Sequence, residues 1–170
     1  LLNSKMEIEL DKLNNFLQKH ENEKIFIFGF TYIIWNFFCT VLKDKNIKLN
    51  LENCILIHGG GWKKLHDKKI NNQKLKKFLK NEFNLKRTCN YYGMVEQTGS
   101  VFLECELGYF HSSIFSEIFI RNSNLDLSPI KKKGLIQVLS LLPLSYPGHN
   151  ILTEDVGAIE GIDNCKCGRK

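Results

Sequence analysis

Internal repeats and long low-complexity segments are absent from this sequence of 170 residues. A repeat architecture and a long flexible linker are therefore excluded. The composition, 43% hydrophobic and 25% charged residues, is ordinary for a globular domain and excludes disorder over most of the chain. We expect one substantial core. Because the sequence begins at Leu1 and ends just after a Cys-Gly-Arg turn, we also expect it to be a fragment of a longer polypeptide.

A local signature of nucleophilic catalysis is also missing. No set of Ser, His and Asp and no pair of Cys and His occurs in a recognisable motif. His58 and His149 are more typical of structural histidines than of catalysts. His58 is the better functional candidate of the two, because it directly precedes a glycine run.

Positive charge is in excess, with a net charge of +6 that comes from lysines between Lys63 and Lys80 and from Lys131 to Lys133. Such runs are typical of a solvated helix face and a turn, and less often of a surface that binds nucleic acid or an anionic membrane. A surface that stacks bases alternates aromatic and basic residues, and these runs do not. We therefore expect no nucleic acid partner.

The longest uncharged run, Ile25–Leu42, approaches the roughly 20 residues that a bilayer-spanning helix needs. Polar residues and a glycine interrupt it. The pattern is more typical of a buried strand at 24–28 followed by a buried helix at 31–43, with Thr31 as the helix cap. We therefore expect no stable membrane span.

Six cysteines occur in a chain that has no secretory segment, so a reducing, cytoplasmic location is expected. Four of them are isolated in apolar sequence, where cysteine acts as a small hydrophobic side chain. Cys165 and Cys167 suggest a metal, but a tetrahedral zinc site needs two more ligands. Cys105 and His111 are conceivable partners, so structural zinc stays an open alternative.

Apolar spacing alternates between helical and strand patterns up to residue 100. The pattern predicts helices at 4–20, 31–43 and 70–83, and strands at 24–28, 54–57 and 88–91. This alternation is typical of an α/β fold with a parallel sheet and helices on both faces. We assign it to a subdomain at residues 1–100. Ligands gather at the carboxyl ends of such strands, where Gly59 to Gly61 and Tyr92-Gly93 are predicted to lie.

From residue 101 onward the pattern predicts strands without helices. Strands are expected at 115–121, 134–141 and 158–160, with turn-rich sequence between the first two. We therefore expect a smaller β-rich subdomain at residues 101–170.

Two short stretches suggest nucleotide chemistry. One is Tyr91-Tyr92-Gly93 with Glu96 three residues on, and the other contains Asp155. A tyrosine ring offers a face for a purine, and glycine lets the backbone approach a ligand closely. Glu96 offers an oxygen ligand of the kind that Mg²⁺ prefers, and Asp155 can accept hydrogen bonds from ribose hydroxyls.

Each of these residues also has a plainer explanation. Glu96 could be a solvated carboxylate, and Asp155 could cap a turn. The run Gly59–Gly61 could be only a flexible turn, because glycines without a Lys-Ser/Thr partner are a weak phosphate signal. Either Tyr91 or Tyr92 could belong to the core, and the sequence does not show which ring faces a ligand.

Four motifs in a fixed order extend the nucleotide interpretation. They are Ile57–Lys63, Tyr91–Thr98, Thr153–Gly157 and Cys165–Arg169. On these motifs the chain resembles the adenylate-forming (acyl-adenylate) superfamily. It is most similar to the acyl-protein synthetases of the bacterial fatty-acid reductase type, and more distantly to phenylacetate-CoA ligases. The resemblance implies the distal part of the large N-terminal domain of such an enzyme, ending at the hinge to a C-terminal domain.

The resemblance also implies roles for the motif residues. The implied nucleotide-binding residues are Gly59, Gly60, Gly61, Tyr91, Tyr92, Gly93, Asp155 and Arg169, and Glu96 is implied as the catalytic residue and Mg²⁺ ligand. Tyr92 would pack on the adenine, while Asp155 and Arg169 would approach the ribose. The implied cofactors are ATP and Mg²⁺, and the implied partners are a carboxylic acid and an acyl-acceptor protein or carrier thiol.

Several departures from the superfamily pattern accompany the resemblance. Val95 replaces a threonine, so a hydroxyl contact is lost or supplied by Gln97 or Thr98. Glu154 replaces a common glycine. The Ser/Thr/Gly-rich phosphate loop and the catalytic lysine of the C-terminal domain are absent from the sequence. We therefore expect this piece to be inactive by itself.

The resemblance predicts ATP-dependent activation of a fatty acid as acyl-AMP, followed by transfer to a protein or carrier thiol. A non-catalytic module that binds a nucleotide or an acyl group is the alternative. A basic nucleic-acid-binding domain is the third interpretation, and it requires affinity that falls steeply with salt.

Overall fold

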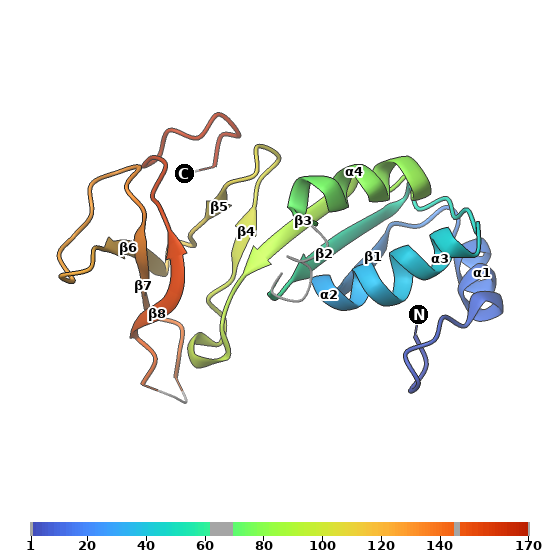
Figure 1. Cartoon of the computed structure of the whole chain (residues 1–170), viewed down its shortest axis with the longest axis horizontal. Helices are drawn as coiled ribbons and strands as arrows, with labels where there is room; N and C mark the ends of the chain where they lie inside the picture. Colours follow the sequence, from blue (N-terminus) through green and yellow to red (C-terminus); the bar gives the residue numbers. More distant parts are fainter. Residues whose placement is uncertain (1, 62–69, 145–146, 170) are drawn as a thin grey trace. The chain divides into compact units, whose positions relative to one another are not determined.

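The computed structural model describes residues 2–61, 70–144 and 147–169. Trp62 and Lys63, which continue the first glycine motif, lie outside the described residues. The chain forms two compact units, at residues 1–90 and 91–170. Figure 1 labels their helices and strands. The division into functional subdomains between residues 100 and 101 stays a prediction.

The first unit alternates helices and strands. Its elements are α1 (Leu10–Lys19), β1 (Ile25–Phe30), α2 (Thr31–Ile33), the π-helical segment η1 (Ile34–Cys39), α3 (Thr40–Asp44), β2 (Cys54–Gly59), α4 (Asn72–Phe83) and β3 (Arg87–Tyr92), whose last residues belong to the second unit. β1 pairs in parallel with β2, from Ile25 opposite Cys54 to Phe30 opposite Gly59, and β3 is next to β2 in the sheet. The predicted α/β fold is confirmed.

The first helix is shorter than the apolar spacing predicted. It begins at Leu10 and not at residue 4, because the residues before it form a tight turn. The side chain of Asn3 accepts hydrogen bonds from the backbone N–H groups of Lys5 and Glu7, both at 2.9 Å. Met6 has a left-handed backbone, with a φ of 63°. Asparagine bonded to its neighbours' backbone in this way competes with helix formation.

The second predicted helix is present as a continuous helical segment from α2 to α3, but Thr31 does not cap it. The residue at the cap position is Phe30. The Thr31 hydroxyl is fully buried, donates to the backbone oxygen of Gly59 at 3.0 Å, and lies 2.8 Å from Nδ1 of His58. The predicted cap is therefore wrong, because the end of β2 engages the hydroxyl. Among the helices that the structure describes, none has the length and apolar character to cross a membrane.

One hydrophobic core joins the helices of the first unit to its strands. Buried members include Leu13 of α1, Phe38 of η1, Leu42 of α3, Leu56 of β2, and Leu75, Leu79 and Phe83 of α4. Side chains alternate along β1: Ile25 and Ile27 pack against this core, whereas Phe26, Phe28 and Phe30 are each more than half exposed. The core therefore uses one face of β1.

The second unit consists mainly of antiparallel strands. After the end of β3 come the 3₁₀ turn η3 (Val95–Gln97), β4 (Phe102–Glu104), β5 (Phe110–His111), β6 (Ser116–Arg121), β7 (Gly134–Ser140) and β8 (Asn150–Gly157). β4 pairs with the end of β3 and with β5, and β6, β7 and β8 form a three-stranded sheet in that order. The smaller β-rich part that the sequence predicted is confirmed.

The strand predicted at residues 158–160 is wrong. The last described strand is β8, which ends at Gly157, and Gly157 lies opposite the first residue of β7, Gly134. The chain beyond Gly157 therefore has no strand of this sheet to pair with. β4 and β5 were not predicted, because strands of three and two residues are too short to show alternation.

Candidate functional site

The glycine run of the first unit starts where β2 ends. Gly59 is the last residue of β2 and is buried, whereas Gly60 and Gly61 are exposed. Gly60 has a φ of 84°, and a Cβ at this position would lie 3.2 Å from the ring of Phe30. Backbone conformation and space therefore both favour glycine. The hydrogen bond from Thr31 to the Gly59 carbonyl fixes the start of the run.

The tyrosine-glycine motif likewise lies where a strand ends, in this case β3. Tyr91 and Tyr92 are its last two residues, are partly buried, and pair with β4. Gly93 follows, and a Cβ at this position would lie 3.2 Å from the backbone oxygen of Ser100. Glycine therefore lets the chain pass close to the end of its own loop.

Glu96 lies in η3 with its side chain exposed, and it forms no hydrogen bond or ion pair with any residue that the structure describes. The next residue, Gln97, is only 1% exposed. Its Nε2 donates to the backbone oxygens of Val138 in β7, at 3.0 Å, and of Gly148, at 2.7 Å. Gln97 therefore anchors the turn, and the carboxylate of Glu96 remains available to a ligand.

The hydroxyl that Val95 lacks is not supplied by Gln97. Gln97 is buried and its amide nitrogen is already bonded, so this expectation is wrong. Thr98 is exposed, and its hydroxyl donates to the backbone oxygen of Val95 at 3.1 Å. Thr98 therefore remains the candidate substitute.

Tyr92 and Asp155 meet although they are 63 positions apart in the chain. The phenol oxygen of Tyr92 donates a hydrogen bond to Oδ2 of Asp155 at 2.8 Å. Burial raises the pKa of the Tyr92 phenol to about 12, and the hydrogen bond to Asp155 acts in the same direction. The phenol is therefore a neutral donor at physiological pH. Asp155 itself is exposed, so its carboxylate can also bond a ligand.

A bulge in β8 presents Asp155. Leu135 of β7 pairs with Val156, but Gln137 pairs with Leu152, so the single residue between them faces three residues on β8. Such bulges break the regular pairing and redirect side chains. The alternative that Asp155 caps a turn is wrong, because Asp155 lies within β8.

Arg169 lies close to an acidic side chain. Its Nη2 is 3.1 Å from Oε1 of Glu106, and both side chains are largely exposed. An exposed pair of this kind stabilises a fold by less than about 1 kcal/mol, so the guanidinium can exchange partners. The contact between Arg169 and a ribose stays a prediction.

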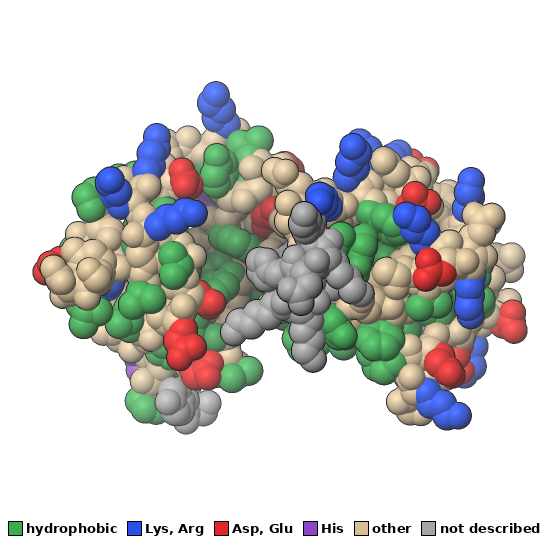
Figure 2. Space-filling model, viewed as in Figure 1, with side chains coloured by type: hydrophobic (Ala, Val, Ile, Leu, Met, Phe, Trp, Pro, Cys, Tyr) green, Lys and Arg blue, Asp and Glu red, His purple; other side chains and the backbone are tan. Residues whose placement is uncertain are grey.

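The basic side chains do not form a single patch on the face that Figure 2 shows. The lysine and arginine side chains that are coloured there lie scattered, with acidic side chains among them. This distribution is typical of a solvated surface. The expected absence of a nucleic acid partner stays a prediction.

Several solved structures have a similar fold. The luciferase-like enzyme from the nonluminescent mealworm Zophobas morio matches with a TM-score of 0.60 and 16% identity, over 89% of this chain and 39% of that chain. ATP-bound MatB from Rhodopseudomonas palustris matches with a TM-score of 0.62 and 12% identity, over 90% and 31%. A long-chain-fatty-acid-CoA ligase, FadD1 from Archaeoglobus fulgidus, matches with a TM-score of 0.55 and 15% identity, over 78% and 27%. The chain thus spans less than two fifths of the length of each.

The sequence itself matches one family model. No curated protein matches with significance. The model described as "Acyl-protein synthetase, LuxE" matches residues 3–170, which is nearly the whole chain. The chain therefore belongs to the LuxE family of acyl-protein synthetases.

Proposed function

We propose that the chain is part of an ATP-dependent ligase that activates a carboxylic acid as acyl-AMP and transfers the acyl group to a thiol. The observation that carries this proposal is the hydrogen bond between Tyr92 and Asp155. It joins the tyrosine-glycine motif to the later acidic motif, as a shared adenosine site requires. Membership of the acyl-protein synthetase family and the adenylate-forming fold support the same reaction class.

The exposed carboxylates supply the polar part of this site. Asp155 accepts hydrogen bonds from the ribose hydroxyls, because its carboxylate is exposed and oriented by the phenol of Tyr92. The tyrosine-glycine backbone carries the adenine, with Tyr91 or Tyr92 against its face. In the same proposal, Gly59 to Gly61 bind nucleotide through their backbone, and Arg169 adds a positive charge near the ribose.

Glu96 is the proposed ligand of Mg²⁺. Its carboxylate suits a hard cation, which takes oxygen ligands, and no described residue neutralises it. Bound Mg²⁺ would draw charge from the α-phosphate while the acid attacks and pyrophosphate leaves. Gln97 positions Glu96 through its two buried hydrogen bonds.

The substrate and the acceptor belong to the same proposal. We infer a fatty acid as the substrate and a protein or carrier thiol as the acceptor, in keeping with the acyl-protein synthetase family. Since the chain spans 39% or less of the solved enzymes that it resembles, we infer that further segments complete the enzyme.

Exchange of labelled pyrophosphate into ATP tests the reaction in the full-length protein. Exchange should require the fatty acid and Mg²⁺, and Glu96→Gln should reduce it by about 10²-fold or more, because the metal stabilises charge in the transition state. Glu154→Gln is the matched control: it removes an exposed carboxylate next to Asp155 and should leave exchange nearly unchanged. Normal exchange in Glu96→Gln would refute the Mg²⁺ role.

The alternative, a module that only binds, makes a different prediction. It would bind AMP or an acyl chain in calorimetry, yet it would exchange no pyrophosphate with any acid. That outcome in the full-length protein would overturn the ligase proposal.

A further inference from the structure

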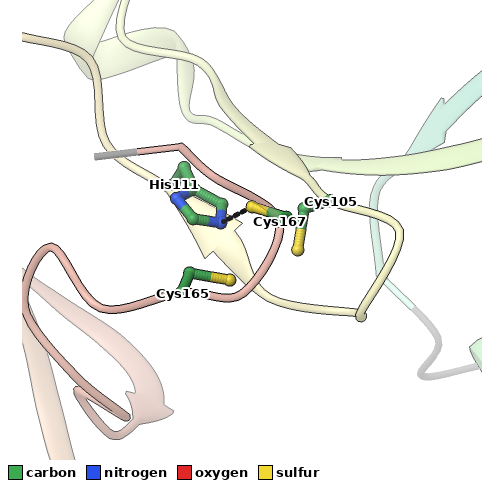
Figure 3. Close-up of side chains that lie close together, drawn as sticks. All are labelled: Cys105, His111, Cys165 and Cys167. Carbon is green, nitrogen blue, oxygen red and sulfur yellow. Dashed lines mark hydrogen bonds between the residues drawn. The ribbon is translucent and has the colours of Figure 1, made fainter.

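Four side chains that commonly bind metals converge in the second unit. They are Cys105, His111, Cys165 and Cys167. In Figure 3 the side chains point toward a common centre. Their ligand atoms all lie within 4.8 Å of one another, and Sγ of Cys167 is 3.4 Å from Nε2 of His111. Ligand atoms around tetrahedral zinc are roughly 3.5–3.8 Å apart, so shifts of about 1 Å would enclose an ion.

Two turns of the same form present three of these ligands. In one, the N–H of Gly108 donates to the backbone oxygen of Cys105 at 3.0 Å, and in the other, the N–H of Gly168 donates to the oxygen of Cys165 at 3.1 Å. Both glycines are left-handed, with φ values of 87° and 82°. The repeated geometry on two distant segments indicates that the cysteines are held in position by the backbone.

The hairpin of β4 and β5 brings in the fourth ligand. Cys105 directly follows β4, and His111 is the last residue of β5, opposite Leu103 of β4. Cys105 is 2% exposed, whereas His111, Cys165 and Cys167 are partly buried. The cluster is therefore partly shielded from solvent.

Further contacts tie the two segments together around the cluster. The backbone N–H of Arg169 points at Sγ of Cys167, 3.5 Å away, a contact that suits a metal-bound thiolate. The Arg169 side chain pairs with Glu106, the residue after Cys105. None of the cysteines in the cluster takes part in a disulfide.

We propose that Cys105, His111, Cys165 and Cys167 bind one zinc ion as a closed structural site. Three sulfurs and one imidazole favour zinc over Mg²⁺ or Ca²⁺, which take oxygen ligands. Four protein ligands leave no open position for a substrate, so the ion stabilises the fold and performs no chemistry. It cross-links the β4–β5 hairpin to residues 165–169. The inference does not depend on the proposed function.

Metal analysis of the purified, untagged full-length protein tests the site. Elemental analysis should find about one zinc ion per chain, and Cys167→Ser or His111→Ala should lower this at least tenfold, because a three-ligand site holds the ion weakly. Cys89→Ser is the matched control: Cys89 is a partly buried cysteine outside the cluster and is not part of a disulfide, so its loss should leave the zinc content unchanged.

Cobalt binding to the wild-type protein is a second measurement, and it does not depend on whether the variants fold. Wild-type protein stripped with a chelator under reducing conditions should take up one Co²⁺ per chain and show the visible absorption of tetrahedral thiolate-bound cobalt. Zinc should displace the cobalt, and Mg²⁺ should not. The proposal would be overturned if the stripped protein did not show this absorption after Co²⁺ is added. It would also be overturned by an equal loss of zinc in Cys89→Ser, or by a disulfide among the four residues under reducing conditions.

Discussion

Gln97→Met tests whether one buried amide holds the Glu96 turn. The substitution keeps the length of the side chain but removes two hydrogen bonds, to the backbone oxygens of Val138 and Gly148. Leaving two buried acceptors without these donors costs about 1–2 kcal/mol each. Oε1 of Gln97 is also buried and has no partner among the described residues, so its removal recovers about 1 kcal/mol. The expected net destabilisation is about 2 kcal/mol.

Hydrogen exchange measured by mass spectrometry reports this loss locally. A free-energy change of about 2 kcal/mol corresponds to exchange that is roughly 30-fold faster in peptides covering η3 and β7. Gln137→Met is the control, because it makes the same substitution on β7 and also removes two hydrogen bonds, from Nε of Arg121 at 2.6 Å and to Asn150 at 2.7 Å, but neither of them reaches η3. Unchanged exchange around η3 in Gln97→Met, or an equal effect in Gln137→Met, would refute the anchoring role.

Two further predictions concern the second unit. The phenol of Tyr92 should ionise near pH 12, because its pKa is raised above the value of 10 that it has in the unfolded chain. The contribution of this phenol to stability is therefore complete below pH 10 and is lost between pH 10 and 12. Tyr92→Phe should lower the free energy of unfolding by about 1 kcal/mol at pH 7, and an ultraviolet titration in which no tyrosine of the wild type ionises above pH 11 would contradict the reasoning. Gly134→Ala should destabilise the β6–β7–β8 sheet by about 1–3 kcal/mol, because the new Cβ would overlap the carbonyl oxygen of Arg121, and an unchanged midpoint in a urea titration would show that the backbone can relax.

The elements that the sequence predicted well are those with long apolar patterns. α4 begins at Asn72 and β2 at Cys54, each close to its predicted position, because buried positions recur along them with a regular period. The errors have local causes. The first helix begins later than predicted because the side chain of Asn3 accepts hydrogen bonds from nearby backbone N–H groups. β8 stops at Gly157 because β7 has no residue before Gly134 that could pair with residues 158–160.

In the candidate site, the sequence predicted that Tyr92 and Asp155 lie together, but it did not predict the residues that hold them in place. Spacing and residue type suggested that Tyr92 and Asp155 belong to one site, and the structure joins them directly. Gln97 could not be assigned from sequence, because glutamine is usually exposed, and its burial depends on carbonyl groups of β7 and of the loop before β8. The bulge that presents Asp155 was equally hidden, since it depends on pairing between strands.

The buried Gln97 and the bulge in β8 explain why the fold accommodates two departures from the superfamily pattern. Val95 and Glu154 replace the threonine and glycine that the resemblance leads one to expect, and both side chains are exposed. Glu154 lies inside the β8 bulge, where the strand does not pair regularly and a longer side chain meets no core. Val95 precedes Glu96 in a turn that Gln97 fixes through its buried hydrogen bonds. The fold therefore does not depend on the identity of either residue.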